Sequence, residues 1–279
     1  MQTQYSQSDK DGLKALVRQL NGFGFPGFWQ LRWMCFRILL YFLHKQFVKQ
    51  DRKKPELYQI AKKGSRFEVR RGTSDSFVID EVWQNHEYGE NHTGVVLDIG
   101  ANIGAFSIYA AQTAEHVIAI EASTQNFQRL QKNIKLNALD NMSTIHACAA
   151  SQDGKSTLNF HDVNNGMSST LFKGPSKTSE TVENITFKTL FEAHQIERLN
   201  FVKCDIEGGE FDVFSGANLP YLSRVSSISM EIHCNYATPD KVRKLLLDMA
   251  DAGFDLRISN PSFLMWTGTG ILHFTKNQA

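Results

Sequence analysis

Residues 95–106 place the strongest constraint on the fold of this chain, because an apolar, β-branched run leads directly into two glycines, Gly100 and Gly104. Such a run is typical of a strand that is covered on both faces of a parallel sheet. The glycines allow a tight turn and a close approach of the backbone, and the free N–H groups of a following helix would face a ligand. We therefore expect a strand, a turn and a helix that together form one wall of a ligand site.

A second apolar run, residues 116–120, ends in Glu121, whose carboxylate could accept hydrogen bonds from both hydroxyls of a ribose. The dinucleotide fingerprint has a glycine where Asn102 stands, and Asp98 would repel a phosphate. We therefore expect S-adenosylmethionine, which carries a ribose and positive charges but no phosphate, rather than NAD or FAD. A strand–helix unit of the same type without any cofactor is the alternative.

From residue 95 onward, runs with strand and helix patterns alternate. The predicted strands are residues 95–97, 117–120, 143–147, 201–203 and 227–231, with a final pair near 255–258 and 271–274. The predicted helices are residues 103–113, 124–137, 207–217 and 239–252. This alternation predicts an α/β fold of the doubly wound, Rossmann-like type, with a seven-stranded and mostly parallel sheet. Residues 153–190, rich in Ser, Thr, Asn and Gly, are expected to form short strands and a loop over the mouth of the site.

Residues 1–63 differ in charge from the rest of the chain. They hold twelve Lys or Arg against four Asp or Glu, whereas the remainder holds eighteen against twenty-five. Within them, an apolar and aromatic segment at residues 28–43 is too short to span a membrane and is followed by a basic cluster. We expect an α-helical extension, distinct from a domain over residues 64–279. This extension would contact the inner face of a membrane through residues 28–54, pair with a second copy as a homodimer, or pack on its own domain.

Cysteine usage and net charge narrow the class of protein. The four cysteines lie far apart and form no C-x-x-C pair, which predicts reduced thiols in a cytoplasmic protein rather than a disulfide framework or a zinc site. The first 20 residues lack the apolar run of a signal peptide. The net charge of +1 gives no indication of a nucleic-acid-binding body, so no nucleic-acid partner is expected.

Charged residues gather where two further predicted strands end. The fourth predicted strand ends in Lys203, with Asp205 and Glu207 after it, and the fifth ends in Glu231, with His233 after it. Because the carboxyl ends of parallel strands meet at one edge of a sheet, these side chains should lie close together. Each charge must be desolvated there, and that cost is easier to explain by a function than by stability.

Several of these motifs resemble those of the FkbM family of S-adenosylmethionine-dependent methyltransferases. They are Asp98-Ile-Gly-Ala-Asn-Ile-Gly104, Glu121, the turn at residues 149–154, Met167-Ser-Ser169, Phe187-Lys-Thr-Leu190, Lys203-Cys-Asp-Ile-Glu-Gly-Gly-Glu210 and Glu231-Ile-His233. The resemblance covers roughly residues 66–235 and implies a class I methyltransferase fold. It also implies O-methylation of a hydroxyl on a sugar, a polyketide or a related molecule. The chain departs from the family pattern at Ala122, where a proline is common, and at Phe191, where an aspartate is common.

The resemblance implies a cofactor site made of Asp98, Gly100, Asn102, Gly104, Glu121, Ala149, Ser151 and Asp153. Asp98 would orient the amino-acid end of the cofactor, directly or through water, and Glu121 would hold the ribose diol. Ala149 and Ser151 would line the adenine slot, and Asp153 would reach the adenine amino group. The two glycines and the asparagine between them would shape the turn.

The resemblance also implies a catalytic group. Asp205 would lie beside the methyl group as the base or as the group that orients the acceptor, with a helix N-cap as the structural alternative. Lys203 would pair with Glu231, and His233 would share in proton transfer because its pKa suits neutral pH. Glu207 would stand in the first turn of a helix, in either a catalytic or a structural role. Because the sequence has no His-rich ligand set, we expect a site without metal. The alternative is a divalent ion that bridges Asp205 and Glu207.

These observations predict an S-adenosylmethionine-dependent O-methyltransferase that acts on a hydroxyl of a sugar or of a glycan- or lipid-linked intermediate. One alternative is a binding module that keeps the fold and has lost catalysis. Another is transfer to a different small-molecule hydroxyl, or to the nitrogen of an amide or nucleic acid. The chain lacks the Asn/Asp-Pro-Pro-Tyr/Phe motif that enzymes of the nitrogen-methylating class use to hold an exocyclic amine.

Overall fold

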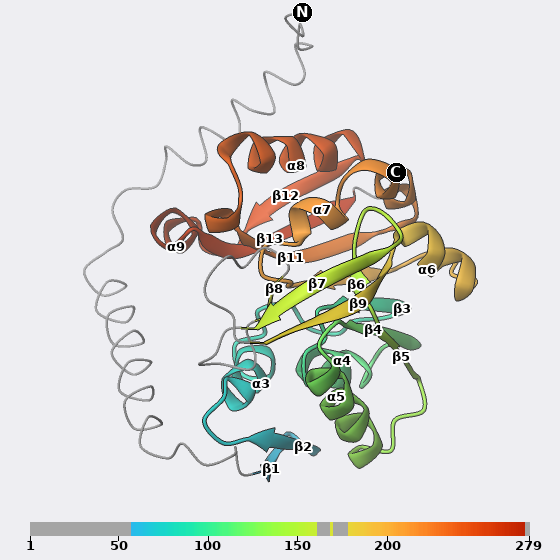
Figure 1. Cartoon of the computed structure of the whole chain (residues 1–279), viewed down its shortest axis with the longest axis vertical. Coiled ribbons are helices and arrows are strands. Elements are labelled where there is room, and N and C mark those ends of the chain that lie inside the picture. Colours follow the sequence, from blue (N-terminus) through green and yellow to red (C-terminus); the bar gives the residue numbers. More distant parts are fainter. Residues whose placement is uncertain (1–56, 161–167, 170–177, 277–279) are drawn as a thin grey trace, which may run out of the picture.

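The computed structural model describes residues 57–160, 168–169 and 178–276 (Figure 1). A seven-stranded sheet of order β12-β13-β11-β10-β3-β4-β5 lies at its centre. The strands are β3 (Val95–Ile99), β4 (His116–Glu121), β5 (Met142–His146), β10 (Phe201–Cys204), β11 (Ser227–His233), β12 (Phe254–Ile258) and β13 (Thr269–Lys276). Only β13 runs antiparallel to its neighbours within this sheet. The predicted doubly wound and mostly parallel sheet is confirmed.

Helices cover both faces of this sheet (Figure 1). They are α3 (Asp75–Trp83), α4 (Ala105–Ala110), α5 (Thr124–Leu136), α6 (Phe187–Ala193), α7 (Glu210–Val213), α8 (Pro239–Asp251) and α9 (Pro261–Thr267), with 3-10 segments η1 (Gly216–Arg224) and η2 (Cys234–Tyr236). Alternate residues of β3 face opposite cores: Leu97 and Ile99 pack with side chains of α6, α8 and η1, and Val96 packs with those of α3 and α4. This double coverage explains the uninterrupted apolar run of β3.

Three helices start at local sequence signals. Ser123, Thr186 and Thr238 stand immediately before α5, α6 and α8, and each side-chain oxygen accepts a hydrogen bond from a backbone N–H of the first turn. The predicted helices over residues 124–137 and 239–252 are confirmed to within one residue.

The predicted helix over residues 207–217 is wrong in its bounds. The backbone φ is 52° at Glu207 and 101° at Gly208, so a right-handed helix does not start there. The single turn α7 begins only at Glu210, and η1 follows it after a break. The N-cap of α7 is Gly209, so the structural alternative for Asp205 as a helix N-cap does not hold.

A second, smaller sheet has the order β6-β9-β7-β8. Its strands are β6 (Cys148–Ala149), β7 (Lys155–Phe160), β8 (Ser168–Ser169) and β9 (Ser179–Ile185). In Figure 1 its long strands β7 and β9 lie in front of the main sheet, between α5 and α7. The short strands expected within residues 153–190 are therefore present, and residues 161–167 and 170–177 lie outside the described residues.

An antiparallel hairpin, β1 (Leu57–Lys62) and β2 (Ser65–Arg70), precedes the main sheet and crosses the predicted boundary after residue 63. Its free edge meets α5 (Figure 1): Asn133 bonds to the backbone of Glu68, and Asn137 to that of Arg66. The membrane or dimer contact predicted for residues 28–54 lies outside the described residues and stays a prediction, as does the division into two domains. None of the described helices is long and apolar enough to cross a membrane.

Candidate active site

The turn after β3 fits closely against the end of β10. The N–H groups of Gly100 and Ala101 both donate to the carbonyl of Ile120, at 3.0 and 2.9 Å. Gly100 has a φ of +79°, and a Cβ there would lie 2.0 Å from the carbonyl oxygen of Asp205. Gly104, at φ +91°, caps α4, and a Cβ there would lie 2.7 Å from Leu130. Both glycines are therefore required by the geometry, as the sequence predicts.

Glu121 is held in place by the backbone. One carboxylate oxygen accepts the N–H of Asn102 at 2.7 Å, and the other accepts the N–H of Ser123 at 2.8 Å. Burial raises the pKa of Glu121, while these two hydrogen bonds and the charge of Lys203 oppose the rise. The side-chain oxygen of Asn102 is buried and has no hydrogen-bond partner among the described residues. The site thus has a fixed carboxylate and an unsatisfied acceptor on one wall.

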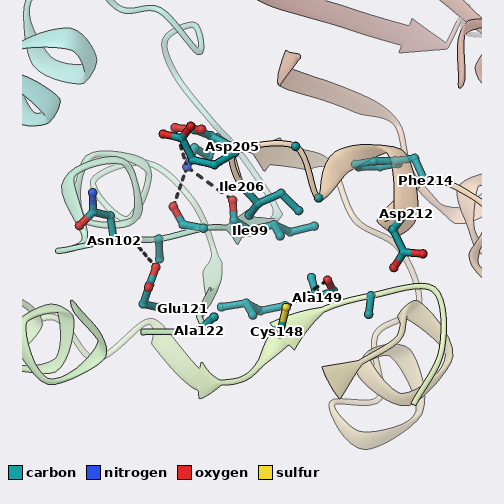
Figure 2. A pocket seen from close by; sticks show the side chains of 18 of the residues that line it. Ile99, Asn102, Glu121, Ala122, Cys148, Ala149, Asp205, Ile206, Asp212 and Phe214 are labelled. Atoms are coloured by element: carbon teal, nitrogen blue, oxygen red, sulfur yellow. Dashed lines mark hydrogen bonds and ion pairs between the residues drawn. The ribbon is translucent and has the colours of Figure 1, made fainter. Parts of the chain in front are cut away.

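A cavity of about 550 Å³ opens beside this turn. Asn102, Glu121 and Ala149 line it together with Lys203, Asp205 and Glu207, so one space joins the predicted cofactor site to three of the four predicted catalytic residues. His233 does not line it. Figure 2 shows Glu121 and Asp205 on the same side as Asn102, with Ala149 further along the wall. The volume is in the range of small-molecule and cofactor sites.

Asp98 does not line this cavity. Its carboxylate is fully buried, accepts a hydrogen bond from the hydroxyl of Ser107 at 2.5 Å and lies 3.3 Å from Nζ of Lys203. Side chains alternate across a strand, so Asp98 faces α4 rather than the open end of β3. The expected role of Asp98 at the amino-acid end of a cofactor, directly or through water, stays a prediction.

Ser151 and Asp153 also lie outside the cavity wall. Ser151 donates through its N–H and hydroxyl to Asp212, at 2.9 and 2.7 Å. Asp153 accepts a hydrogen bond from the hydroxyl of Thr189 in the first turn of α6. The carboxylate that does line this part of the cavity is Asp212, which Figure 2 shows beside Phe214 and across from Glu121.

Lys203 connects the two parts of the site. Its buried ammonium donates to the carbonyl of Gly100 at 2.8 Å, lies 3.3 Å from Asp98 and lies 4.0 Å from Asp205. The predicted pair of Lys203 with Glu231 is therefore wrong; the lysine lies on the β3 side of its own strand, where Asp98 is its register partner. Lys203 thus links the turn after β3 to the end of β10.

Four side chains converge at the ends of β10 and β11, and we call them the acceptor-end cluster: Asp205, Glu207, Glu231 and His233. Nε2 of His233 lies 3.5 Å from Glu207 and 3.9 Å from Glu231. Its Nδ1 lies 3.2 Å from the fully buried Glu210. The sequence prediction that these groups meet at one edge of the sheet is confirmed.

A family model for the methyltransferase FkbM domain matches residues 98–256, more than half of the chain. The chain belongs to the FkbM methyltransferase family. Methyltransferase 1 of Beauveria bassiana is 24% identical over 190 residues, 60% of this chain and 75% of that protein. The hexuronic acid methyltransferase AglP of Haloferax volcanii is 29% identical over 152 residues, 54% of this chain and 61% of that protein.

Among solved structures, the methyltransferase FkbM of Methylobacillus flagellatus aligns with a TM-score of 0.42 and 17% identity, over 66% of this chain and 43% of that chain. The family and the order of the central sheet agree, since a mostly parallel sheet with β13 inserted antiparallel between β11 and β12 is the class I methyltransferase arrangement. The predicted family and fold are confirmed, and the protein is a methyltransferase.

Crowding of charge shifts the pKa values in the acceptor-end cluster of this FkbM domain. Burial and the nearby Asp205 raise the pKa of Glu207 to about 7 and that of Glu231 to about 8, against the opposing charge of His233. Burial lowers the pKa of His233, but the hydrogen bond to Glu210 and the surrounding carboxylates outweigh it and raise the pKa to about 10. Glu207 and Glu231 thus titrate near neutral pH, whereas His233 keeps its charge there. The expectation that the pKa of His233 suits proton transfer at neutral pH is therefore wrong, because the surrounding carboxylates stabilise its charged form.

Sequence reasoning missed two residues that line the cavity of the FkbM domain. Tyr88, in the segment before β3, donates its hydroxyl to Asp205 at 3.3 Å. Tyr236, in η2, packs over Gly208, where a Cβ would lie 2.8 Å from the tyrosine side chain. No pattern in the sequence marks Tyr88, whereas Tyr236 follows closely after the Glu231-Ile-His233 ending and could have been included with it.

Proposed function

We propose that this protein transfers a methyl group from S-adenosylmethionine to a hydroxyl group of a sugar, in a glycan or a lipid-linked intermediate. The observation that carries this proposal is the single cavity lined by Glu121 at one place and by Asp205 and Glu207 at another. A cofactor held at the first place would direct its methyl group toward an acceptor held at the second.

The residues around the turn fit this cofactor. Each oxygen of Glu121 accepts one backbone N–H and keeps a free lone pair for a hydroxyl of the ribose diol. The buried, unpartnered oxygen of Asn102 needs a donor, which a ligand in the cavity would supply. The half-buried Cys148 and Ala149 offer an apolar wall to an adenine ring.

The chemistry needs alignment and a proton acceptor. The acceptor oxygen attacks the methyl carbon, the new carbon–oxygen bond forms, and the carbon–sulfur bond breaks with its electron pair passing to sulfur. The hydroxyl proton passes to the carboxylate of Asp205, with Glu207, whose pKa is about 7, as a further proton acceptor. Lys203 and Tyr88 hold Asp205 in place, at 4.0 and 3.3 Å.

The lining of the acceptor end favours a sugar. Tyr236 offers an aromatic ring and Lys241 a cationic group along the same cavity. The relative AglP acts on a hexuronic acid, as its name states, and a lysine would suit the carboxylate of such a sugar. These two observations support a sugar hydroxyl over an amide or nucleic-acid acceptor.

An activity assay on Asp205→Asn tests the proton-accepting end. The full-length protein is incubated with S-adenosylmethionine labelled in the methyl group and a panel of neutral and uronic-acid glycans. We expect Asp205→Asn to lose at least about 100-fold in turnover, since an amide cannot accept the proton. Asp80→Asn, an exposed aspartate on α3, serves as the matched control. Wild-type turnover in Asp205→Asn would move the proton acceptor elsewhere, and an absence of transfer by the wild type would contradict the proposed acceptor.

A titration with S-adenosylhomocysteine tests the cofactor end. Glu121→Ala should bind the nucleoside at least about tenfold more weakly, because a charge-assisted hydrogen bond to a buried hydroxyl contributes about 1.5–3 kcal/mol. Asp205→Asn should bind it within a few-fold of the wild type. Equal affinity of Glu121→Ala and the wild type would refute the assignment of the ribose site.

A further inference from the structure

Three potential ligand atoms converge at the acceptor end from two adjacent strands. Asp205 directly follows β10, and Glu231 and His233 stand two residues apart on β11, so their side chains point to the same side of the sheet. One oxygen of each carboxylate and one nitrogen of the imidazole all lie within 4.8 Å of one another. A small rotation of each side chain would bring the three atoms around one point.

The orientation of His233 is a second, independent observation. Its side chain is only 8% exposed, and Nδ1 is fixed by the buried carboxylate of Glu210 at 3.2 Å. Glu210 is itself held by two backbone groups. Its Oε1, which contacts Nδ1, also accepts the N–H of His233 at 2.6 Å, and its Oε2 accepts the N–H of Gly208 at 2.8 Å. Nε2 therefore faces the carboxylates of Glu207, at 3.5 Å, and Glu231, at 3.9 Å. A histidine with one ring nitrogen held by a carboxylate and the other aimed at a ligand is typical of metal sites.

We propose that Asp205, Glu231 and His233 bind a divalent cation of the Mg²⁺ or Mn²⁺ type beside the acceptor end of the cavity, which Asp205 lines. Two carboxylates and one imidazole are ligands that suit these ions. Metal–ligand bonds of about 2.1 Å place ligand atoms about 3.0–4.2 Å apart, only slightly closer than the present atoms. The side chains of Asp205 and Glu231 are 30% and 29% exposed, so they have room to close on the ion.

The charge around these ligands supports a cation rather than a further anion. Glu207 and Glu210 add two carboxylates next to His233. The neighbouring ammonium of Lys203 lies closer to Asp98, at 3.3 Å, than to Asp205, at 4.0 Å. The lysine thus borders the ligand set on the β3 side and does not occupy its centre.

The role of the cation in catalysis rests on the proposed function, whereas its binding does not. An octahedral ion with three protein ligands keeps positions for water or for an oxygen of the acceptor. A hydroxyl bound there would lose its proton more easily, because the ion stabilises the oxyanion, and Glu207 stands within the cluster to accept that proton. The acceptor end would then bind a sugar through two neighbouring oxygens.

Binding of Mn²⁺ to the full-length protein tests the proposal directly. The protein is freed of metal with a chelator, and free Mn²⁺ is followed by electron paramagnetic resonance, with and without S-adenosylhomocysteine. We expect one Mn²⁺ per wild-type chain and at least about tenfold weaker binding in Glu231→Gln and in His233→Asn. Glu183→Gln, an exposed glutamate on β9, is the matched control and should bind as the wild type does.

Circular dichroism establishes that each variant is folded, and His233→Asn carries the test if Glu231→Gln does not fold. The proposal is overturned if the wild type binds no Mn²⁺ either with or without S-adenosylhomocysteine. It is also overturned if both folded variants bind Mn²⁺ as tightly as the wild type. In either case His233 shares a proton with the carboxylates instead of binding a cation. Calorimetry with S-adenosylhomocysteine in chelator separates the two ideas. Nucleoside binding without Mn²⁺ binding removes only the cation site, and Mn²⁺ binding without nucleoside binding removes only the proposed function.

Discussion

The two ends of the cavity are built in different ways. At the cofactor end, Glu121 is held by backbone N–H groups of Asn102 and Ser123, which lie close to it in sequence. At the acceptor end, Asp205 and His233 are held by side chains, from Tyr88 in one case and Glu210 in the other. Backbone groups cannot turn away, whereas side chains can. The cofactor end is therefore fixed in advance, and the acceptor end can adjust to what it binds.

The largest expected effect comes from Lys203, which joins the two ends. Lys203→Met should lower the free energy of unfolding by about 3–5 kcal/mol, because the fully buried Asp98 would keep a charge without its partner. Urea unfolding measures this. Lys155→Met, which removes only an exposed lysine, should behave as the wild type.

The double variant Asp98→Asn/Lys203→Met sharpens the comparison. It should recover part of the lost stability, since no uncompensated buried charge remains. If Lys203→Met alone is as stable as the wild type, the ion pair of Lys203 with Asp98 does not connect the two ends of the cavity. The fixed cofactor end and the adjustable acceptor end would then be independent of each other.

A smaller effect is expected at the glycine turn. Gly100→Ala should cost about 2–4 kcal/mol, because the left-handed backbone and a Cβ against the Asp205 carbonyl both oppose it. Gly64→Ala is the matched control, with a φ of +89° and open space around the new Cβ, and should cost about 1 kcal/mol. Thermal unfolding gives both values; equal costs would mean that the turn can move away from β10 and is not fixed.

The smallest effect concerns pH and the acceptor end. The pKa of Glu231 is raised from 4.5 to about 8, so in the metal-free protein the folded state holds a proton that the unfolded state releases between these values. The contribution of Glu231 to stability is therefore most favourable below pH 4.5 and falls as pH rises toward 8. Glu231→Gln lacks the titrating group. Between pH 5 and pH 8, its free energy of unfolding should therefore fall by at least about 1 kcal/mol less than that of the wild type, as measured by urea unfolding. Parallel pH profiles for wild type and variant would show that crowding of charge does not strain this end.

The sequence was informative where contacts are local. The turn after β3, the place of Glu121 and the alternation of strands and helices depend on neighbours a few residues away, and the structure confirms them. The meeting of Asp205 with His233 followed from a general property of parallel sheets. The starts of α5 and α8 lie at the predicted residues, and the structure shows one capping side chain before each of them.

Contacts between distant segments escaped prediction. Tyr88 and Asp205 are 117 residues apart in sequence, and Ser151 and Asp212 are 61 apart. The partner of a buried lysine depends on the face of its strand and on the register with the neighbouring strands. This is why Glu231 was predicted as the partner of Lys203, whereas the structure shows Asp98. The left-handed backbone at Glu207, which shortened the predicted helix, is a conformation that glutamate rarely adopts, so no residue preference announced it.

The two asparagines of α5 that contact the first hairpin show how a helix can take the place of a strand. Residues four apart on a helix rise by about 6 Å, and residues two apart on a strand by about 6.6 Å, so Asn133 and Asn137 match the spacing of Glu68 and Arg66. Each carboxamide carries a donor and an acceptor, as a peptide group does, and serves the outward-facing N–H and C=O of one β2 residue. Of the two edges that a two-stranded ribbon has, the β2 edge is thereby closed by side chains and protected from pairing with another chain without a third strand.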